Sequence, residues 1–340
     1  MTLVLVVNAG STSLKLSAVA DDESSEQVDS LDALPDGVGA VAHRVVHGGE
    51  RFRDPVVISA DIERALSELA QVAPLHNPPA LAAIEAARRR LPDVPHVAVF
   101  DTAFHATLPD EASTYAVPLA WREQWGIRRY GFHGLSVQWA SQQVRVERLI
   151  VCHLGGGCSV TAVRDGRSVD TTMGFTPLEG VPMASRSGSV DPGALLHLLK
   201  TERLTVRELD RALEQEAGLL GLSGSSDRVE ELERSTDPNA RLALAVYAYR
   251  IAVAVGAMTV ALDGLDAIVF TAGVGERSAF VRERVCVPLR HLGVEVDPVR
   301  NRAATPDAEV QTASSAVRIA VLGAREDVVA ARAVRAALGI

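Results

Sequence analysis

The sequence is short of several residue types, and each shortage narrows the function. Aromatic residues make up only 4% of the 340 residues, so the stacking platforms that bind single-stranded nucleic acid are scarce. Positive charge is also in short supply, because 34 Lys and Arg residues face 43 Asp and Glu residues, for a formal net charge of -9 at pH 7. An acidic surface repels nucleic acid and anionic membranes at long range. We therefore expect neither as a partner, and any anion site must be locally basic.

Cysteine is scarce as well. The three cysteines are Cys152, Cys158 and Cys286, an odd number without the spacing of a zinc site. The pattern indicates reduced thiols in a cytoplasmic protein, and Cys152 lies in an apolar run where a packed side chain is expected.

The sequence also lacks a long apolar run free of charge. The longest apolar stretch, residues 242–262, carries Arg250 at its middle, and a charge within a bilayer is costly. This favours a buried core helix or an interface helix over a membrane span. Residues 3–7 form a short apolar run without preceding basic residues, which predicts a buried strand rather than a signal peptide.

Apolar residues are plentiful at 47%, and the length suffices for two domains. Residues 3–19 and 149–163 each read as an apolar strand, a Gly/Ser turn and an alternating strand. Each segment therefore predicts a β-hairpin. The repetition indicates either a duplicated domain that faces itself across a cleft or a chance recurrence of a common motif.

Other strands and helices are mixed along the chain as in an α/β protein. The expected elements are strands at 41–46, 96–100, 266–271 and 317–322 and helices at 61–70, 80–91 and 326–338. Residues 171–193 are expected to form a long loop, and such loops in compact proteins are usually functional.

Two glycine-containing segments suit a nucleotide. Residues 8–15 (NAGSTSLK) offer successive N–H groups and hydroxyls to a phosphate at a strand end, although a plain hairpin turn explains them equally and the spacing is not that of a Walker motif. Residues 270–276 (FTAGVGE) predict a strand-to-glycine turn that passes under a flat adenine. It is only loosely like a dinucleotide fingerprint.

Four charged or polar residues stand in glycine-rich or strand-end settings. Arg44 and Arg186 lie close to glycines, and a pair of guanidinium groups suits the charge of a phosphoryl transition state. Asp101 ends an apolar strand, where it either lines a cleft or caps the following helix. His133 lies between two glycines, which favours a site role, but no second histidine has metal-ligand spacing.

Taken together and in order, these segments resemble the acetate kinase family. The matching stretches are NAGSTSLKL, AHRVVHGGERF, PLHNPPALAAIEA, VFDTAFHATLP, YGFHG, HLGGGCSV, DTTMGFTPLEGVPMASRSGSVDPG and FTAGVGERS. The resemblance implies two similar ribonuclease-H-like α/β domains around a nucleotide cleft, the fold shared by acetate and sugar kinases, heat-shock chaperones and actin. The implied domains are residues 1–147, completed by the C-terminal helix 326–340, and residues 148–325.

The resemblance also implies an activity. Members transfer a phosphoryl group reversibly from ATP to acetate, giving acetyl phosphate and ADP, with Mg²⁺ or alternatively Mn²⁺, and they are homodimers. Propionate or butyrate as the acceptor is the nearest alternative, and a non-catalytic nucleotide-binding regulator on the same fold is a more distant one.

The family's functional residues fall on positions of this chain. The implied catalytic residues are Arg44, Asp101, His133 and Arg186, and the implied metal-linked residues are Asn8 and Glu326. The implied nucleotide and phosphate contacts are Ser11, Ser13, Lys15, His153, Gly155, Gly157, Asp227, Gly273 and Gly275. The implied pocket for the acyl group consists of Val46, Leu75, Phe132 and Pro177.

Three positions depart from the family pattern. Gly156 stands where the family usually has Asn, Val137 replaces a usual His, and Arg277 replaces a usual Asn near the adenine. The HLGGG form resembles butyrate kinases instead. These departures bear on nucleotide and acyl preference more than on the class of reaction.

Overall fold

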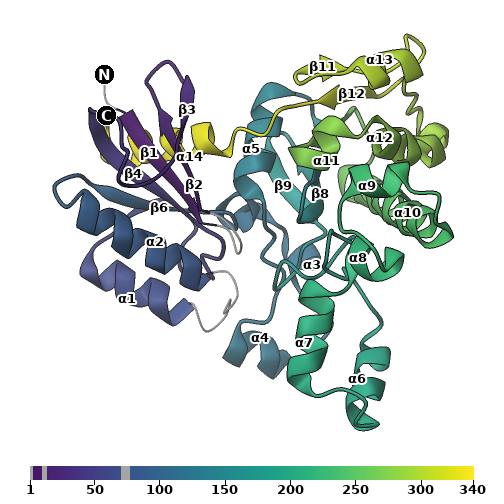
Figure 1. Ribbon diagram of the computed structural model, residues 1–340, viewed down its shortest axis with the longest axis horizontal. Coiled ribbons are helices and arrows are strands. Elements are labelled where there is room, and N and C mark those ends of the chain that lie inside the picture. The colour runs from purple at the N-terminus through teal and green to yellow at the C-terminus, as the bar shows by residue number, and fades with distance from the viewer. Residues whose placement is uncertain (1–2, 10–13, 70–76) are drawn as a thin grey trace. The chain divides into compact units, whose positions relative to one another are not determined.

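The computed structural model describes residues 3–9, 14–69 and 77–340, and the chain divides into two compact units (Figure 1). The first unit contains Met1–Ala106, Phe132–Trp139 and Arg325–Ile340. The second contains Thr107–Gly131 and Ala140–Ala324. Residues 107–131 and 140–147, which we expected in the N-terminal domain, thus group with the second unit. The C-terminal helix groups with the first.

The first unit is built on a six-stranded sheet with the order β3-β2-β1-β4-β6-β5. Its strands are β1 (Leu3–Ala9), β2 (Leu14–Val19), β3 (Ser25–Val28), β4 (Val38–Val45), β5 (Val56–Val57) and β6 (His96–Phe100). Its helices are α1 (Ala60–Leu69), α2 (Asn77–Arg90) and α14 (Glu326–Leu338), and a 3₁₀ turn covers Ala103–Thr107.

The second unit has a sheet with the order β11-β12-β10-β7-β8-β9. Its strands are β7 (Arg148–Leu154), β8 (Cys158–Arg164), β9 (Arg167–Thr171), β10 (Ala267–Thr271), β11 (Ala308–Glu309) and β12 (Arg318–Val321). In chain order, the first helices of this unit are α3 (Asp110–Ser113), α4 (Leu119–Trp125), α6 (Pro192–Lys200), α7 (Val206–Gln215), α8 (Gly218–Ser223) and α9 (Val229–Arg234). They continue with α10 (Pro238–Leu262), α11 (Ala272–Arg277), α12 (Ala279–Cys286) and α13 (Pro298–Ala303), while α5 (Gly134–Gln143) begins in the first unit and ends in the second.

The two sheets repeat one topology. In each, three antiparallel strands (β3-β2-β1 and β9-β8-β7) are followed by two parallel neighbours (β4-β6 and β10-β12) and one antiparallel edge strand. Both predicted hairpins are present, as β1–β2 and β7–β8. The repeated hairpin therefore marks a duplicated α/β core.

Alternation along the central strands of the first unit decides which side chains face which helix. One set packs against α14 and consists of Val4, Val6, Ala40, Ala42, Val97 and Val99. Figure 1 shows that this helix lies along the sheet. The intervening residues pack against α1 and α2 on the opposite face. Because side chains alternate between the faces of a strand, Asn8 and Arg44 continue the set that faces α14.

Helix α10 is the long apolar stretch of the sequence. Asp237 caps its start by accepting a hydrogen bond from Asn239 N, and Pro238 opens the first turn. The helix packs against β7, β8 and β9. It is long and apolar enough to cross a membrane by length and composition, but 44% of its most apolar window is buried within the protein. This partial burial suits a helix that covers a sheet.

The structure corrects one local prediction. Residues 272–276, expected as a glycine turn, are helical and belong to α11, which follows β10 without a loop. Ala272, the first residue of the helix, has φ of 63°, so a single left-handed residue makes the bend that we had assigned to a turn. The long loop is confirmed, because no helix or strand lies between the end of β9 and the start of α6.

A pair of buried histidines crosses the first sheet from β4 to β6. His43 Nε2 lies 2.9 Å from His96 Nδ1, and His96 Nε2 lies 2.9 Å from the carbonyl oxygen of Leu91. A carbonyl only accepts, so His96 Nε2 donates to Leu91, His96 Nδ1 accepts, and His43 Nε2 donates to it. This arrangement is that of two neutral rings, which the burial of both side chains favours. Burial lowers the pKa of His43 to about 3 and also lowers the pKa of His96.

This pair predicts a pH dependence of stability. The unfolded chain takes up a proton at His43 near its ordinary pKa, whereas the folded chain does so only near pH 3, so the free energy of unfolding falls as the pH drops through this interval. We expect His43→Gln to reduce that slope by up to about 1.4 kcal/mol per pH unit. Urea unfolding between pH 4 and pH 7 measures it. The exposed His197→Gln is the control, and equal slopes for both variants would contradict the assignment.

Candidate active site

Three polar side chains meet at the carboxyl ends of the central strands of the first unit. Asn8 on β1 and Arg44 on β4 are register partners on adjacent parallel strands. Asp101 directly follows β6, the other neighbour of β4. The carboxyl ends of parallel strands are the usual place for ligand sites in α/β sheets.

The geometry around Arg44 is that of a fixed cation. Its Nε lies 2.8 Å from Asp101 Oδ1, its Nη2 lies 2.5 Å from Asp101 Oδ2, and its Nη1 donates to Asn8 Oδ1 over 2.9 Å. The Asp101 side chain is 1% exposed and the Arg44 side chain 15%. Desolvation acts to lower the pKa of Arg44, but the charges of Asp101 and Glu326 and the hydrogen bonding to Asp101 together outweigh it and raise that pKa above its ordinary value. Arg44 is therefore a permanent, oriented cation.

A second carboxylate lies beside this pair. Glu326 opens α14, and Asn8 Nδ2 donates to Glu326 Oε2 over 3.5 Å. Desolvation raises the pKa of Glu326, against the opposing effect of Arg44. The carboxylate of Glu326 and the amide oxygen of Asn8 are the hard oxygen ligands that Mg²⁺ takes, usually one or two at a time. Among the described residues, no group of three or more His, Cys, Asp or Glu gathers as a metal cluster.

His133 is held to the Asp101 segment at two points. The residue has φ of 60°, an uncommon conformation for a residue other than glycine. The N–H of Gly134 donates to the carbonyl of Asp101 over 3.1 Å, and His105 Nε2 lies 2.9 Å from the carbonyl oxygen of Phe132. Burial lowers the pKa of His105 to about 4, so its ring is neutral and donates. These bonds fix where the His133 backbone lies relative to Asp101.

The second unit carries the other predicted arginine. Arg186 lies in the long loop and pairs with Glu214 of α7, with 3.0 Å between Nε and Oε2. The N–H of Ser187 donates to the carbonyl of Leu213 over 3.0 Å. Sequence reasoning missed Glu214, because α7 shows only the amphipathic pattern of a surface helix. Burial raises the pKa of Glu214, against the lowering effect of Arg186.

A pocket of about 220 Å³ lies within the second unit. Its lining includes Gly155, Gly156, Ala184, Asp227, Arg228, Val229, Glu230, Gly273, Val274, Arg277 and Ser278. Three glycines on the lining leave backbone open to a flat or phosphate-bearing ligand. Arg277 Nε lies 3.3 Å from Glu230 Oε1, and Arg228 Nη2 lies 3.6 Å from Glu230 Oε2. The sequence pointed to Gly155, Asp227 and Gly273 but not to Arg228 or Glu230.

The remaining predicted residues are distributed as follows. His153 is buried at the end of β7, and Gly275 packs in α11 against Phe270 rather than lining the pocket. Lys15 on β2 is exposed and pairs in register with Asn8, and the carbonyl of Gly157 accepts a hydrogen bond from the N–H of Gly155 over 3.0 Å. Val46 and Phe132 are buried in the first unit and Pro177 is buried in the second. Ser11, Ser13 and Leu75 lie outside the described residues.

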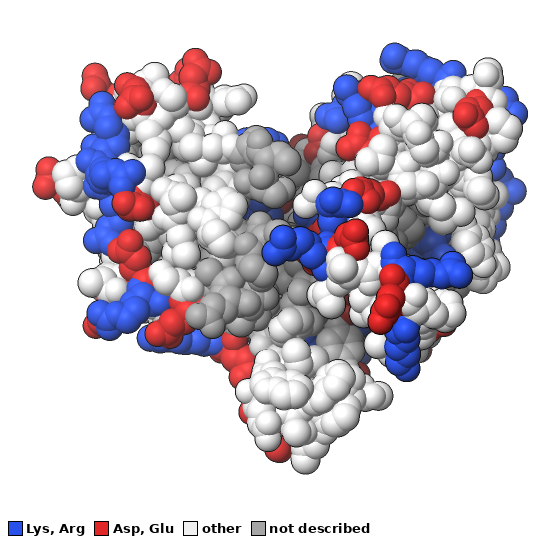
Figure 2. Space-filling view, turned by 60° about the horizontal axis from the view of Figure 1, so that its bottom comes forward, with Lys and Arg blue, Asp and Glu red and all other residues white. Residues whose placement is uncertain are grey.

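Among the described residues, the face shown in Figure 2 carries no basic patch that would indicate a binding site for a polyanion. Basic and acidic side chains are interspersed there instead of gathering into one basic field. A nucleic-acid surface would carry such a field. The described part of that face therefore carries no basic field of this kind.

Comparison with known proteins shows the family to which the chain belongs. The model of the acetokinase family matches residues 27–332. Acetate kinase from Nostoc punctiforme is 46% identical over 343 residues, covering 95% of this chain and 84% of its own. Acetate kinase from a Synechococcus species is 49% identical over 301 residues, covering 85% of this chain and 74% of its own.

Solved structures share the complete fold. A propionate kinase from Francisella tularensis superposes with a TM-score of 0.92 at 32% identity, covering 98% of this chain and 99% of its own. Acetate kinase from Porphyromonas gingivalis gives 0.88 at 31% identity, covering 99% and 100%. The chain therefore belongs to the acetokinase family, whose members are kinases that transfer phosphate to a carboxylate.

The two hydrogen bonds that hold the His133 backbone in place, from Gly134 N–H and from His105, form a clamp that gives a mutational prediction. A Cβ at Gly134 would lie 2.0 Å from the carbonyl oxygen of Asp101, so Gly134→Ala must push the two segments apart. We expect phosphoryl transfer to a carboxylate to fall by about 100-fold, the cost of a displacement of about 1 Å in an active site. Steady-state assays on folded protein test it. Gly256→Ala, where a Cβ meets nothing within 4 Å in α10, should keep full activity; equal activities would refute the clamp.

Proposed function

We propose that the protein transfers the γ-phosphoryl group of ATP reversibly to acetate, giving acetyl phosphate and ADP. The observation that carries this proposal is the Arg44–Asp101 pair, a desolvated and oriented guanidinium at the ends of three parallel strands. Family membership supports the same chemistry. The names of the relatives favour acetate as the acceptor.

The reaction needs no general base. A carboxylate is already deprotonated at pH 7, so one of its oxygens attacks the γ-phosphorus directly. A new P–O bond forms to the carboxylate while the bond to the β,γ-bridging oxygen breaks, and ADP leaves with that electron pair. The residues of the chain have only to bring the two anions together and to balance the charge.

We assign that task to the arginines and to His133. Arg44 holds the carboxylate or the transferring group, and Asp101 fixes the plane of its guanidinium through two hydrogen bonds. Arg186 and His133 stabilise the charge on the equatorial oxygens. Because Arg186 is paired with Glu214, it too is preorganised before substrate binds.

Glu326 and Asn8 would hold Mg²⁺, with phosphate oxygens and water completing its shell. The bound ion would neutralise charge on the β- and γ-phosphates. Because Asn8 already accepts a hydrogen bond from Arg44 and donates to Glu326, the metal-linked and catalytic groups of the first unit form one connected set.

The nucleotide would bind in the glycine-lined pocket of the second unit, near Gly155, Asp227 and Gly273. Gly156, which replaces a usual Asn, leaves that position without a side-chain donor. Arg277, which replaces another, faces Glu230. We expect these changes to act on the affinity for the nucleotide rather than on the chemical step.

Propionate is the nearest alternative acceptor, since one solved relative is named a propionate kinase. One methylene in an apolar pocket changes selectivity by only about 1–3 kcal/mol. The acyl pocket that we propose includes Val46, Phe132 and Pro177, all buried. A purely regulatory role is less favoured, because Arg44, Asp101 and Arg186 are all present and paired.

The first test is formation of acyl phosphate, trapped with hydroxylamine, from MgATP and acetate, propionate or butyrate in parallel. We expect turnover with acetate above the other acids. Arg44→Ala and Arg186→Ala should each lose at least about 100-fold in kcat, because each removes charge stabilisation made in the transition state. Arg64→Ala, an exposed arginine of α1, should match the wild type. No acyl phosphate from any acid, with protein that binds ATP, would overturn the proposal.

We further propose a cytoplasmic homodimer that uses the exposed side of α10. Leu242, Val253 and Val260 are 54%, 47% and 84% exposed, and their spacing places them on one face of the helix. Apolar side chains gathered on one exposed face are a feature of interaction surfaces. A second copy of the chain would cover them.

Negative charges introduced on this face of α10 should dissociate the dimer into monomers. We expect Val253→Glu with Val260→Glu to shift the protein to monomer, because burying unpaired carboxylates at an interface is costly. Sedimentation or light scattering measures the mass. Val206→Glu, at a residue of α7 that is 73% exposed, should leave it unchanged. A wild-type monomer, or a dimer that survives both charges, would contradict the assignment.

A further inference from the structure

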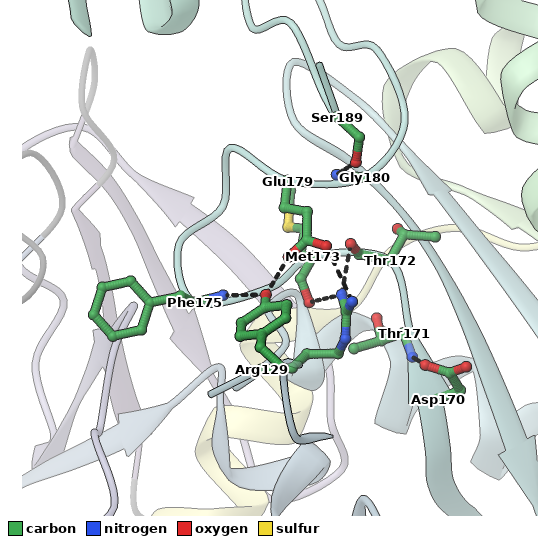
Figure 3. Close-up of polar contacts among 10 residues, drawn as sticks. Arg129, Asp170, Thr171, Thr172, Met173, Phe175, Glu179, Gly180 and Ser189 are labelled. Carbon is green, nitrogen blue, oxygen red and sulfur yellow. Dashed lines mark hydrogen bonds and ion pairs between the residues drawn. The ribbon is translucent and has the colours of Figure 1, made fainter. Parts of the chain in front are cut away.

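The first half of the long loop is wrapped around side chains from an earlier part of the chain. Residues 172–180 contain no helix or strand, so their backbone has no regular ladder to hold it. Arg129 and Tyr115 both hydrogen-bond to this segment, and Figure 3 shows the guanidinium of Arg129 pointing at it. All of these residues belong to the second unit.

Arg129 binds the loop at three points. Its Nη1 donates to the carbonyl of Thr172 over 3.0 Å and to that of Met173 over 3.2 Å, and its Nη2 lies 3.1 Å from Glu179 Oε1 (Figure 3). The Arg129 side chain is 17% exposed. One guanidinium thus joins the start of the segment to its end.

Tyr115 closes the same segment from the side. Its hydroxyl donates to Glu179 Oε2 and accepts a hydrogen bond from the N–H of Phe175 over 3.0 Å. Desolvation and the bond to Glu179 raise the pKa of Tyr115, so the phenol keeps its proton and remains a donor. The guanidinium of Arg129 also lies over the Tyr115 ring, 5.4 Å from its centre.

Close packing leaves little freedom between the two anchors. A Cβ at Gly174 would lie 1.7 Å from Glu179 Oε2 and 2.0 Å from the Tyr115 hydroxyl oxygen. Only glycine allows this approach. The segment from residue 172 to Glu179 is therefore a closed loop whose shape is set by side-chain hydrogen bonds.

Pro177 lies inside this closed loop and is buried. It has no N–H with which to hold its own position, so its place follows from the anchors on either side. Arg186, further along, is held by different partners, since Arg186 pairs with Glu214 and Ser187 bonds to Leu213. The two functional halves of the loop thus have different side-chain anchors, and Gly180 and Ser189 hydrogen-bond to each other between them.

We propose that Tyr115, Arg129 and Glu179 are positioning residues that set the place of Pro177 and thereby the selectivity of the enzyme among short carboxylic acids. The inference rests on the proposed function, in which Pro177 lines the acyl pocket. The network acts on the acid and not on the phosphoryl group, because it holds the 172–179 half of the loop and leaves the anchors of Arg186 untouched.

Tyr115→Phe is the sharpest test, because it removes one oxygen and keeps the ring under Arg129. Glu179 Oε2 and the N–H of Phe175 then lose a partner, and Pro177 gains freedom. We expect the KM for acetate to rise about 10-fold, the equivalent of one net hydrogen bond. The ratio of kcat/KM for propionate to that for acetate should rise, while the KM for ATP and kcat at saturating acid stay within about twofold of wild type.

A second variant and a control keep the test decisive. Glu179→Gln preserves the shape but removes the charge that faces Arg129, and it should shift the acid KM and the propionate-to-acetate ratio in the same direction. Glu202→Gln, at an exposed carboxylate between α6 and α7, should change neither. Thermal unfolding of all four proteins checks that they are folded.

The outcomes separate the inference from the proposed function. Acid-specific shifts in both network variants support the positioning role. An active wild type with unchanged acid KM and selectivity in both variants overturns it, as do equal rises in the KM for acid and for ATP, which signal general loosening. A wild type that forms no acyl phosphate from any acid overturns the proposed function itself, and the inference with it.

Discussion

The arrangement of the first unit depends on one ion pair, the two-point contact of Arg44 with Asp101. Removing a cation and a carboxylate from water is costly, and such a pair contributes little net stability. Its value lies in orientation, since a guanidinium with two hydrogen bonds to one carboxylate has a fixed plane. The remaining Nη1 then reaches Asn8, and Asn8 reaches Glu326. This one contact thereby fixes the positions of four residues, which come from three strand ends and one helix start.

In the second unit, too, a few side chains hold backbone segments that have no regular hydrogen bonds. Arg186 is fixed by Glu214, and the 172–179 segment by Arg129, Tyr115 and Glu179. Loop residues carry function in many α/β proteins because a rigid scaffold presents them. Here the scaffold is a set of partly buried polar contacts. Each contact is satisfied within its own unit, which keeps the cost of burying these groups low.

Much of the fold could be predicted because local patterns coincide with tertiary ones. Strand β6 and helix α14 have the predicted bounds, and the two hairpins are found where the Gly/Ser turns lie. The prediction was wrong at residues 272–276, because two glycines favour a turn in isolation. In the fold, the left-handed Ala272 lets a helix start directly at the strand end, and the local pattern does not report such a bend.

The sequence by itself determined the class of fold, the duplication and the family, since these depend on periodic apolar residues and on short motifs that are contiguous in the chain. It also singled out Arg44, Asp101, His133 and Arg186, because arginine, aspartate and histidine beside glycines at strand ends are conspicuous in one dimension. Only the tertiary structure decided their partners. Glu214 lies 28 residues from Arg186 and has no local signature. Glu326 was implied by the family resemblance, but its hydrogen bond to Asn8, 318 residues away, appears only in the structure. Which charges meet depends on how strands and helices pack, because an ion pair is set by distance in space and not by separation along the chain.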